Sequence, residues 1–208
     1  MNEITQVLGA VARGEAGAER SYWLLRKEAA MRFKETEDKS VAERVLKVNL
    51  LRPFDEPTAA SLEPFANVLA RLLPSASETL RRTNTNEAEY SMLLGLLAYR
   101  RGDYAKAKDW AQRSLDVASG KALPNAADFI ILSMSLHQLG NRSVARLQLE
   151  QAETLIRTGF DLDFDIWHRS GAVLLTNWRD WVSVRLLLHE AKALISQESV
   201  PPSNASFF

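Results

Sequence analysis

The chain has 208 residues, 46% of them hydrophobic and 25% charged, as expected of a globular protein large enough to bury a sizeable core. Lys and Arg together total 26, as do Asp and Glu, so the formal net charge is zero. This balance removes the usual electrostatic reason to expect nucleic acid or an anionic membrane surface as a partner. The chain has no cysteine, which excludes disulfides, thiolate metal ligands and cysteine nucleophiles and favours a reducing compartment.

The beginning of the chain, MNEITQVLGAVARGE, lacks a basic start and a sustained apolar run, so it does not have the pattern of a signal peptide. No stretch reaches the roughly 18 to 20 apolar residues that a membrane span requires. We therefore expect a cytoplasmic protein with no membrane partner.

Apolar residues recur with the helical period along most of the chain, and Gly and Pro lie mostly between the periodic segments. Strand-like alternation is absent, so we predict an all-α protein. Residues 1–14 are expected to form a frayed segment and residues 198–208 a flexible tail. Between them we predict degenerate helical hairpins over residues 15–83 and three helical repeats over residues 88–197.

The N-terminal part of the chain carries a capping signal and an ambiguous proline. The sequence SVAE at Ser40 to Glu43 fits a capping box, in which Ser and Glu bond to each other's backbone amides. Pro64 must either start a new helix or kink the one that contains it, because it has no amide hydrogen. The helices expected in this part cover residues 15–34, 40–51, 58–73 and 76–82.

The second part of the chain repeats itself. Small residues in alternate helices, Gly95, Ser133 and Gly171, are spaced by 38 and again by 38 residues, which is typical of a solenoid of stacked helix pairs. The six predicted helices pair as hairpins through the turns RGD, LGN and TNW. They cover residues 88–101, 104–118, 125–139, 142–158, 164–176 and 179–197.

The small residues have a packing explanation, because two helices approach closely only where side chains are small. We expect Gly95 to face Ala107, Ser133 to face Ala145 and Gly171 to face Ser183. Glycine in the first two turns suits a helix end, where positive φ is needed. The two turn glycines are Gly102 and Gly140.

The first repeat, LGLLAYRRGDYAKAKDWAQRSL, resembles a tetratricopeptide repeat. That motif has Leu-Gly in the first helix, Gly-x-Tyr at the turn, and then Ala followed by Ala or Ser. The matching residues in this repeat are Leu94, Gly95, Gly102, Tyr104, Ala107 and Ser114. The second repeat fits at Leu132, Ser133, Gly140, Ala145, Leu149 and Ala152. The third is degenerate, since Asn177-Trp178 replaces the turn glycine.

This resemblance implies a right-handed superhelix of antiparallel helix hairpins. The usual period of the motif is 34, so a spacing of 38 implies about four extra residues per unit. The expected boundaries of the three units are about 88–124, 125–162 and 163–197.

A narrower resemblance extends over roughly residues 5–197. Segments such as AMRFKETEDKSVAERVLKVNLLRP and ILSMSLHQLGNRSVARLQLEQA are similar to the C-terminal helical region of large planctomycete- and verrucomicrobia-type bacterial proteins. Those proteins carry an N-terminal Ser/Thr protein kinase domain or WD40 repeats. The resemblance implies, as an alternative function, the regulatory C-terminal region of such a signalling protein. The chain itself has no Gly-rich kinase loop, HRD or DFG, so any kinase activity would lie outside it.

Catalytic and metal-binding patterns are weak in this sequence. The three histidines, His137, His168 and His189, have none of the spacings typical of metal ligands. The acidic stretch DLDFD lacks the glycine and the final glutamate of a calcium loop, and we expect it to cap a helix instead. No phosphate-binding loop is present, so we expect no catalytic residues, no cofactor and no metal. An enzyme with a buried carboxylate pair between helices remains an alternative.

We therefore expect a non-catalytic scaffold module that binds a protein or peptide, with self-association also possible. The tetratricopeptide resemblance implies a concave groove lined by the first helices of the units. The candidate groove residues are Met92, Tyr99, Arg100, Met134, His137, Gln138 and His168. Ordinary core packing is an alternative explanation for Met92. The tryptophans Trp167, Trp178 and Trp181 are either binding residues or a seal at the end of the last hairpin.

Overall fold

The computed structural model describes residues 17–74, 85–118, 122–170 and 178–196. Every regular element in these ranges is a helix, which confirms the prediction of an all-α protein. The helices are α2 (Ala18–Arg32), α3 (Lys39–Leu50), α4 (Glu56–Ser61), α5 (Glu63–Ala70), α6 (Thr85–Arg100), α7 (Tyr104–Val117), α8 (Ala122–Gln138), α9 (Arg142–Ser170) and α10 (Trp178–Ser196). The expected helix over residues 76–82 lies outside the described residues.

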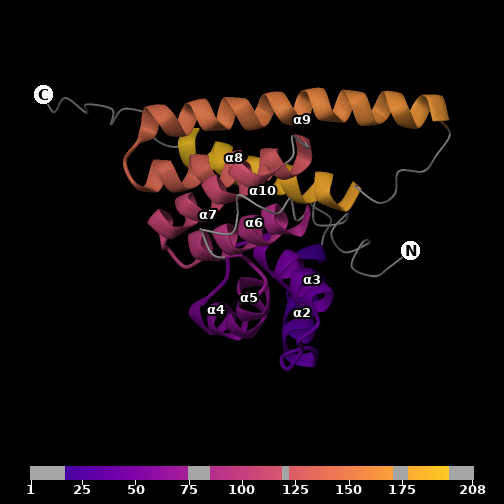
Figure 1. Ribbon diagram of the computed structural model, residues 1–208, viewed down its shortest axis with the longest axis vertical. Helices are drawn as coiled ribbons and strands as arrows, with labels where there is room; N and C mark the ends of the chain where they lie inside the picture. Colours follow the sequence, from indigo (N-terminus) through magenta and orange to yellow (C-terminus); the bar gives the residue numbers. More distant parts are fainter. Residues whose placement is uncertain (1–16, 75–84, 119–121, 171–177, 197–208) are drawn as a thin grey trace, which may run out of the picture.

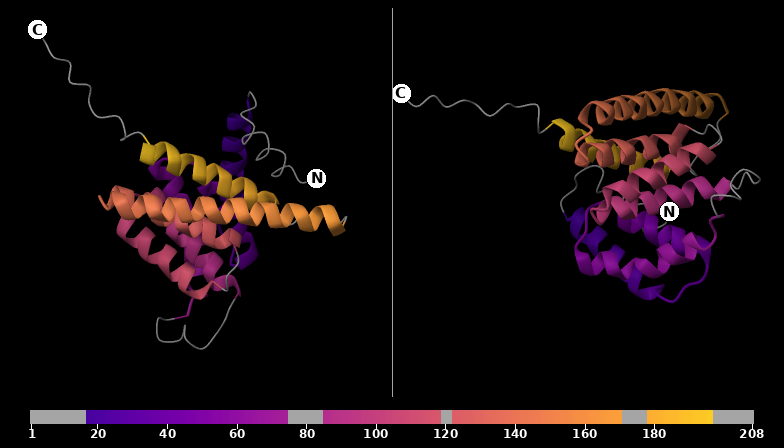
Figure 2. Two further views of the ribbon diagram at one scale, coloured as in Figure 1. Left: turned by 90° about the horizontal axis from the view of Figure 1, so that it is seen from above. Right: turned by 60° about the vertical axis from the view of Figure 1, so that its left-hand side comes forward.

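The helices stack in chain order (Figure 1). Helices α2 to α5 form one end, α6 and α7 follow, and α8 and α9 form the other end. Helix α10 turns back from the far end of α9 and packs against both α8 and α9 (Figure 2). Helices α6 and α8 also contact each other directly, so they lie side by side in the stack.

The larger apolar core of the described residues runs through this stack. It extends from Ala30 in α2, through α3, α5, α6, α7, α8 and α9, to Ile195 in α10. A smaller cluster of Ala18, Tyr22, Val48 and Leu51 joins α2 to α3. The Tyr22 hydroxyl donates a 2.6 Å hydrogen bond to the Val48 carbonyl, which satisfies its polar atom inside this cluster.

The predicted small-residue contacts form in the two complete hairpins. A Cβ atom added to Gly95 would lie 3.2 Å from Trp110 Cβ, 3.3 Å from the Ala107 carbonyl oxygen and 3.4 Å from the Ala111 nitrogen. In the next hairpin, Ser133 Oγ donates a 2.8 Å hydrogen bond to the Ala145 carbonyl. Both pairs expected from the sequence are therefore confirmed. Gly171 lies outside the described residues.

The two glycine turns also form as predicted. Gly102 lies in the turn after α6 with φ 78°, and Gly140 lies in the turn after α8 with φ 82°. Residues other than glycine adopt such positive φ values only at an energetic cost. Asp103 Oδ1 then accepts the Lys106 amide at 3.1 Å and caps the start of α7. The third turn, TNW, begins outside the described residues.

The start of α3 differs from the expected capping box at Ser40 to Glu43. The cap is Asp38, two residues earlier than Ser40, and its Oδ1 accepts the Ser40 amide at 2.7 Å and the Val41 amide at 3.3 Å. The backbone of Asp38 is extended, with φ −77° and ψ 117°, as an N-cap requires. The prediction was wrong because the helix begins at Lys39, which places Ser40 inside its first turn.

The helix expected over residues 58–73 is two helices, which settles the role of Pro64. Helix α4 ends at Ser61, and Pro64 lies in the first turn of α5. Amides in the first turn have no partner within the helix, so the missing amide hydrogen of Pro64 costs no helical hydrogen bond. Pro57 occupies the equivalent place in α4, whose cap Asp55 accepts the Thr58 amide at 3.1 Å.

The break expected between residues 158 and 164 is absent, and α9 runs without interruption from Arg142 to Ser170. At 29 residues it is about 44 Å long. Its sequence contains no proline, and its single glycine, Gly159, weakens a helix by only about 1 kcal/mol relative to alanine. The DLDFD stretch is therefore inside a helix and does not cap a separate one.

Replacing Gly95 with leucine should destabilise the protein by about 1–3 kcal/mol, because the new side chain would enter the contact between α6 and α7. The measurement is the free energy of unfolding by chemical denaturation. Ala105→Leu is the control, since Ala105 is exposed on α7 and its change should stay within about 0.5 kcal/mol. Equal effects of the two substitutions would contradict the close packing at Gly95.

Candidate functional site

The structure places the candidate groove residues mainly in the interior. Tyr99, Met134 and His137 are buried, and Met92 is half-buried against the core. The Arg100 side chain is 3% exposed, while Gln138 is exposed. His168 belongs to α9, but its side chain lies outside what the structure describes, as do the side chains of Trp167, Trp178 and Trp181.

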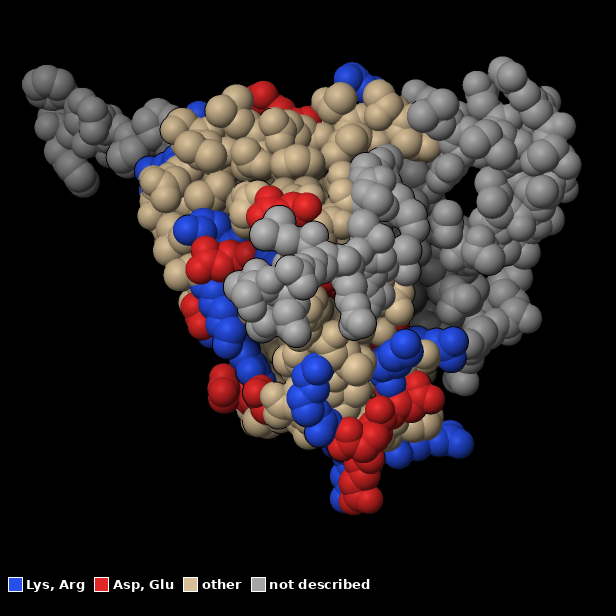
Figure 3. All heavy atoms as spheres, in the orientation of Figure 1, with Lys and Arg blue, Asp and Glu red and all other residues tan. Residues whose placement is uncertain are grey.

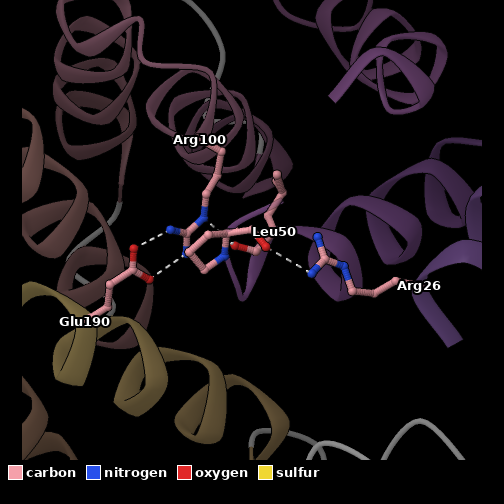
Figure 4. A network of polar contacts seen from close by, with 5 residues as sticks. Arg26, Leu50, Arg100 and Glu190 are labelled. Carbon is pink, nitrogen blue, oxygen red and sulfur yellow. Dashed lines mark hydrogen bonds and ion pairs between the residues drawn. The ribbon is translucent and has the colours of Figure 1, made fainter. Parts of the chain in front are cut away.

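The candidate residues on this face of α6 and α8 are buried where α10 packs. Arg100, the last residue of α6, binds both oxygens of the Glu190 carboxylate on α10, with Nη2 to Oε2 at 2.7 Å (Figure 4). Such bidentate pairing is the strongest arrangement available to a guanidinium and a carboxylate. Since α10 also contacts α8, it bridges the end of α6 and the side of α8. We call the surface of α6 and α8 that carries Tyr99, Arg100, Met134 and His137 the α6–α8 face.

Arg100 has a second partner that does not depend on α10. Its Nε donates a 3.1 Å hydrogen bond to the carbonyl of Leu50, the last residue of α3 (Figure 4). The carbonyl end of a helix carries partial negative charge, which a cation stabilises. The guanidinium is thus anchored on α3 by one nitrogen and offers the other two to a carboxylate.

A second buried arginine approaches the same end of α3. Arg26 of α2 is 1% exposed and donates a 3.3 Å hydrogen bond from Nη1 to the Pro53 carbonyl (Figure 4). Its guanidinium carbon also lies 4.5 Å from the ring centre of Trp23 and 5.2 Å from that of Tyr22, within the range of cation–π attraction. Burial lowers the pKa of Arg26, and the nearby charge of Arg100 acts in the same direction.

Tyr99 belongs to the same junction. Burial raises the pKa of its hydroxyl above the ordinary value, and the negative charge of Glu190 adds to that effect. A hydrogen bond with Gln138, at the end of α8, acts in the opposite direction. The Glu190 carboxylate of α10 therefore lies near Tyr99 and Arg100 at the end of α6, and Tyr99 is in turn bonded to Gln138 at the end of α8.

The face of α10 that packs inward is an aliphatic stripe. Val184, Leu187, Ala191 and Ile195 are buried at helical spacing and belong to the same core as Tyr99 and Met134. The opposite side of α10 is polar and exposed, and there Lys192 Nζ lies 2.7 Å from Glu153 Oε1 on α9. The α6–α8 face therefore accepts an amphipathic helix with a carboxylate beside its apolar stripe.

Two carboxylates are buried where the start of α6, the end of α7 and the start of α8 meet. Asp128 of α8 is completely buried, and Ser114 Oγ of α7 lies 2.7 Å from both Asp128 Oδ2 and the Ala88 carbonyl oxygen of α6. A hydroxyl has one hydrogen to donate. A protonated Asp128 would donate to Ser114, and Ser114 could then donate to Ala88, which would link the three helices.

Burial supports this protonated form, because it raises the pKa of Asp128 well above the usual aspartate range. The other carboxylate, Glu87 of α6, takes a different partner: its Oε1 lies 2.9 Å from Arg113 Nη2 on α7. The same Arg113 nitrogen donates a 2.6 Å hydrogen bond to the Pro74 carbonyl. The two acids are thus each bound to α7 and serve as cross-links between helices. No group of three or more His, Asp or Glu residues in the described ranges could hold a metal ion.

Sequence reasoning missed Glu190 and Asp128, although both leave a signal. Glu190 lies three residues after Leu187 and directly before Ala191, next to an apolar stripe, where a charge needs a partner. Asp128 is the single charged residue in the run ALPNAADFIILSMSL. The partners of both residues come from distant parts of the chain, so the sequence could mark the positions but could not supply the contacts.

Charge on the surface is mixed. Lys and Arg side chains alternate with Asp and Glu on the face seen in Figure 3, and no extended area of one sign appears there. Among the side chains that the structure describes in α9 and the turn before it, the exposed large apolar ones are Leu139, Val144 and Leu147. Among the described helices, none has the combination of length and apolar character needed to cross a membrane.

Comparison of the chain with protein-family models, with curated protein sequences and with solved structures gives no match.

The raised pKa of Asp128 predicts how the stability of the fold depends on pH. An aspartate in the unfolded chain loses its proton near pH 4, at about its ordinary pKa of 3.9, whereas burial raises the pKa of Asp128 in the fold well above that value. Ionisation then favours only the unfolded state, so this residue lowers stability as the pH rises from about 4 until Asp128 itself ionises. Asp128→Asn should remove that decline and match or exceed the wild type at pH 7.

The measurement is the free energy of unfolding from denaturant titrations at a series of pH values. Asp109→Asn is the control, because it removes a carboxylate from the exposed side of α7. A decline that is the same in wild type and Asp128→Asn would show that Asp128 does not hold a proton in the fold.

Proposed function

We propose that this chain is a non-catalytic module that binds a protein or peptide segment through the α6–α8 face. One observation carries the proposal: this face carries a guanidinium, Arg100, that is fixed to the backbone of α3 and binds the carboxylate of another helix. A surface with an apolar area and a positioned arginine suits the recognition of an amphipathic helix.

The chemistry of the buried acids also favours binding over catalysis. Glu87 is paired with Arg113, and Asp128, whose pKa burial raises, is bonded to Ser114. A general acid–base pair needs groups that can exchange protons with a substrate, and these two groups hold helices together. The proposal therefore assigns no catalytic residue and no cofactor.

The tetratricopeptide relationship and the superhelical arrangement belong to this proposal. Support comes from the spacing of 38 residues between Gly95 and Ser133 and from the matching contacts of these residues in successive hairpins. The alternative, a regulatory region of a larger bacterial Ser/Thr kinase or WD40 protein, rests on the sequence resemblance.

The test is affinity capture from native lysate with quantitative mass spectrometry, comparing the wild type with Arg100→Ala. We expect a partner that the wild type retains and Arg100→Ala loses, because the variant lacks the group that binds a carboxylate. Tyr99 is unsuitable for this test, since its ring belongs to the apolar core, whereas the hydrogen bonds of Arg100 are made by its guanidinium.

Arg101→Ala is the matched control. Arg101 is adjacent in sequence, but it binds Glu63 of α5 and donates a 2.7 Å hydrogen bond to the Ala59 carbonyl of α4. A partner lost equally by both variants, or by neither, would move the binding surface away from Arg100. Circular dichroism before capture confirms that each variant is folded.

A further inference from the structure

We infer that α10 is a displaceable occupant of the α6–α8 face, and that the partner is an amphipathic helix with a carboxylate that replaces α10 there. This inference rests on the proposed function and adds the chemistry of the ligand and the regulation of its site. The chain would then bind its partner only when α10 has left the face.

Helix α10, which occupies the α6–α8 face in the structure, shows what kind of helix fits there. Along α10, aliphatic residues are buried at positions i, i+3, i+7 and i+11, which are Val184, Leu187, Ala191 and Ile195. The carboxylate at i+6, Glu190, reaches Arg100. A partner helix with the same stripe and an acidic residue in the same place would make the same contacts.

Arg100 is prepared for a carboxylate before any helix arrives. The hydrogen bond from its Nε to the Leu50 carbonyl joins α6 to α3, and neither helix depends on α10 for its position in the stack. When α10 leaves, Nη1 and Nη2 remain directed at the vacated place. The positive charge of the nearby Arg26 further favours an anionic group there.

The same arginine makes the face selective. A helix without an acidic residue would cover Arg100 and leave a buried cation with a single carbonyl partner, which is strongly unfavourable. An apolar helix of the right shape is therefore expected to bind poorly, because it would leave the charge of Arg100 unpaired.

Helix α10 can leave without separating the rest of the stack. Helices α6 and α7, α7 and α8, and α8 and α9 contact one another directly, so α10 lies between none of these pairs. A further ion pair of α10, between Lys192 and Glu153, is exposed at 52% and 39%, and such pairs contribute little.

The first experiment is native-state hydrogen exchange on the wild-type chain. We expect the backbone amides of α10 to exchange at least about tenfold faster than the most protected amides of α8, through an opening that leaves α8 intact. Exchange of α10 only at the rate of global unfolding would overturn the inference, because α10 would then be a permanent part of the core.

The second experiment measures replacement directly. A fluorescent peptide of residues 178–196 is titrated with the full-length Leu187→Ser variant, whose own α10 is weakened, and with the wild type, and binding is followed by anisotropy. We expect the variant to bind the peptide at least about tenfold more tightly than the wild type does. A variant that stays folded and binds no better than the wild type would overturn the inference.

Matched peptides test the role of the carboxylate. The Glu190→Gln peptide should bind at least about tenfold more weakly, whereas the His189→Gln peptide, altered on the exposed side of α10, should bind normally. Equal binding by all three peptides would refute the selection for a carboxylate. A dimer that exchanges α10, seen by light scattering, would make a second copy the occupant and overturn the assignment to a partner protein.

These assays need no natural partner, so the inference and the proposed function can fail separately. If the peptide binds no better to the Leu187→Ser variant than to the wild type while a captured partner still depends on Arg100, the binding function stands and displacement of α10 is refuted. If the peptide exchanges but lysate proteins bind equally to wild type and Arg100→Ala, the proposed partner recognition is refuted.

Discussion

The close approach of paired helices sets the position of almost everything else in this protein. At Gly95 an added Cβ atom would lie only 3.2 Å from Trp110 Cβ on α7, and at Ser133 the hydroxyl reaches the backbone of α9 directly. Because these contacts recur in successive hairpins, α6 and α8 come to lie side by side. Their common surface is the α6–α8 face, and α10 is the helix that packs there.

The interior of the stack contains several ionisable groups, and they are compensated in three ways. Arg100 and Arg26 use backbone carbonyls at and after the end of α3, where the helix dipole is negative. Glu87 uses a guanidinium. For Asp128, burial raises the pKa and so favours the neutral form. A buried charge is costly unless it is paired, so these arrangements fix the register of the helices that supply the partners.

The helical period and the small-residue spacing were enough to predict the class of fold, the α6–α7 and α8–α9 hairpins and the contacts of Gly95 and Ser133. These features follow from local patterns along the chain. The start of α3 and the continuity of α9 were predicted wrongly. In both cases a sequence signal marked a possible boundary, and the choice between Asp38 and Ser40, or between a break and a continuous helix, depends on small differences in local free energy.

The candidate groove illustrates a different limit of sequence reasoning. The tetratricopeptide resemblance implied that Tyr99, Met134 and His137 line one groove, and the structure buries these residues. An apolar stripe with one charge describes equally well a core surface and a surface that binds a helix, because the physical requirements are the same. A core surface and a binding surface differ in whether the covering helix comes from the same chain. Here that helix carries Glu190, which lies 90 residues after Arg100 in the sequence.

The attachment of α10 to the chain sets how strong a competing helix must be. A tethered segment competes at an effective concentration that is in the millimolar range for short flexible connections. A partner's apparent dissociation constant therefore rises in proportion as the open fraction falls. A helix with only the contacts of α10 would gain little against such a competitor. Under the proposed displacement, a partner would have to be more strongly helical, make additional contacts beyond the α6–α8 face, or bind at more than one place. Arg100 would then select among such helices for those that bring a carboxylate.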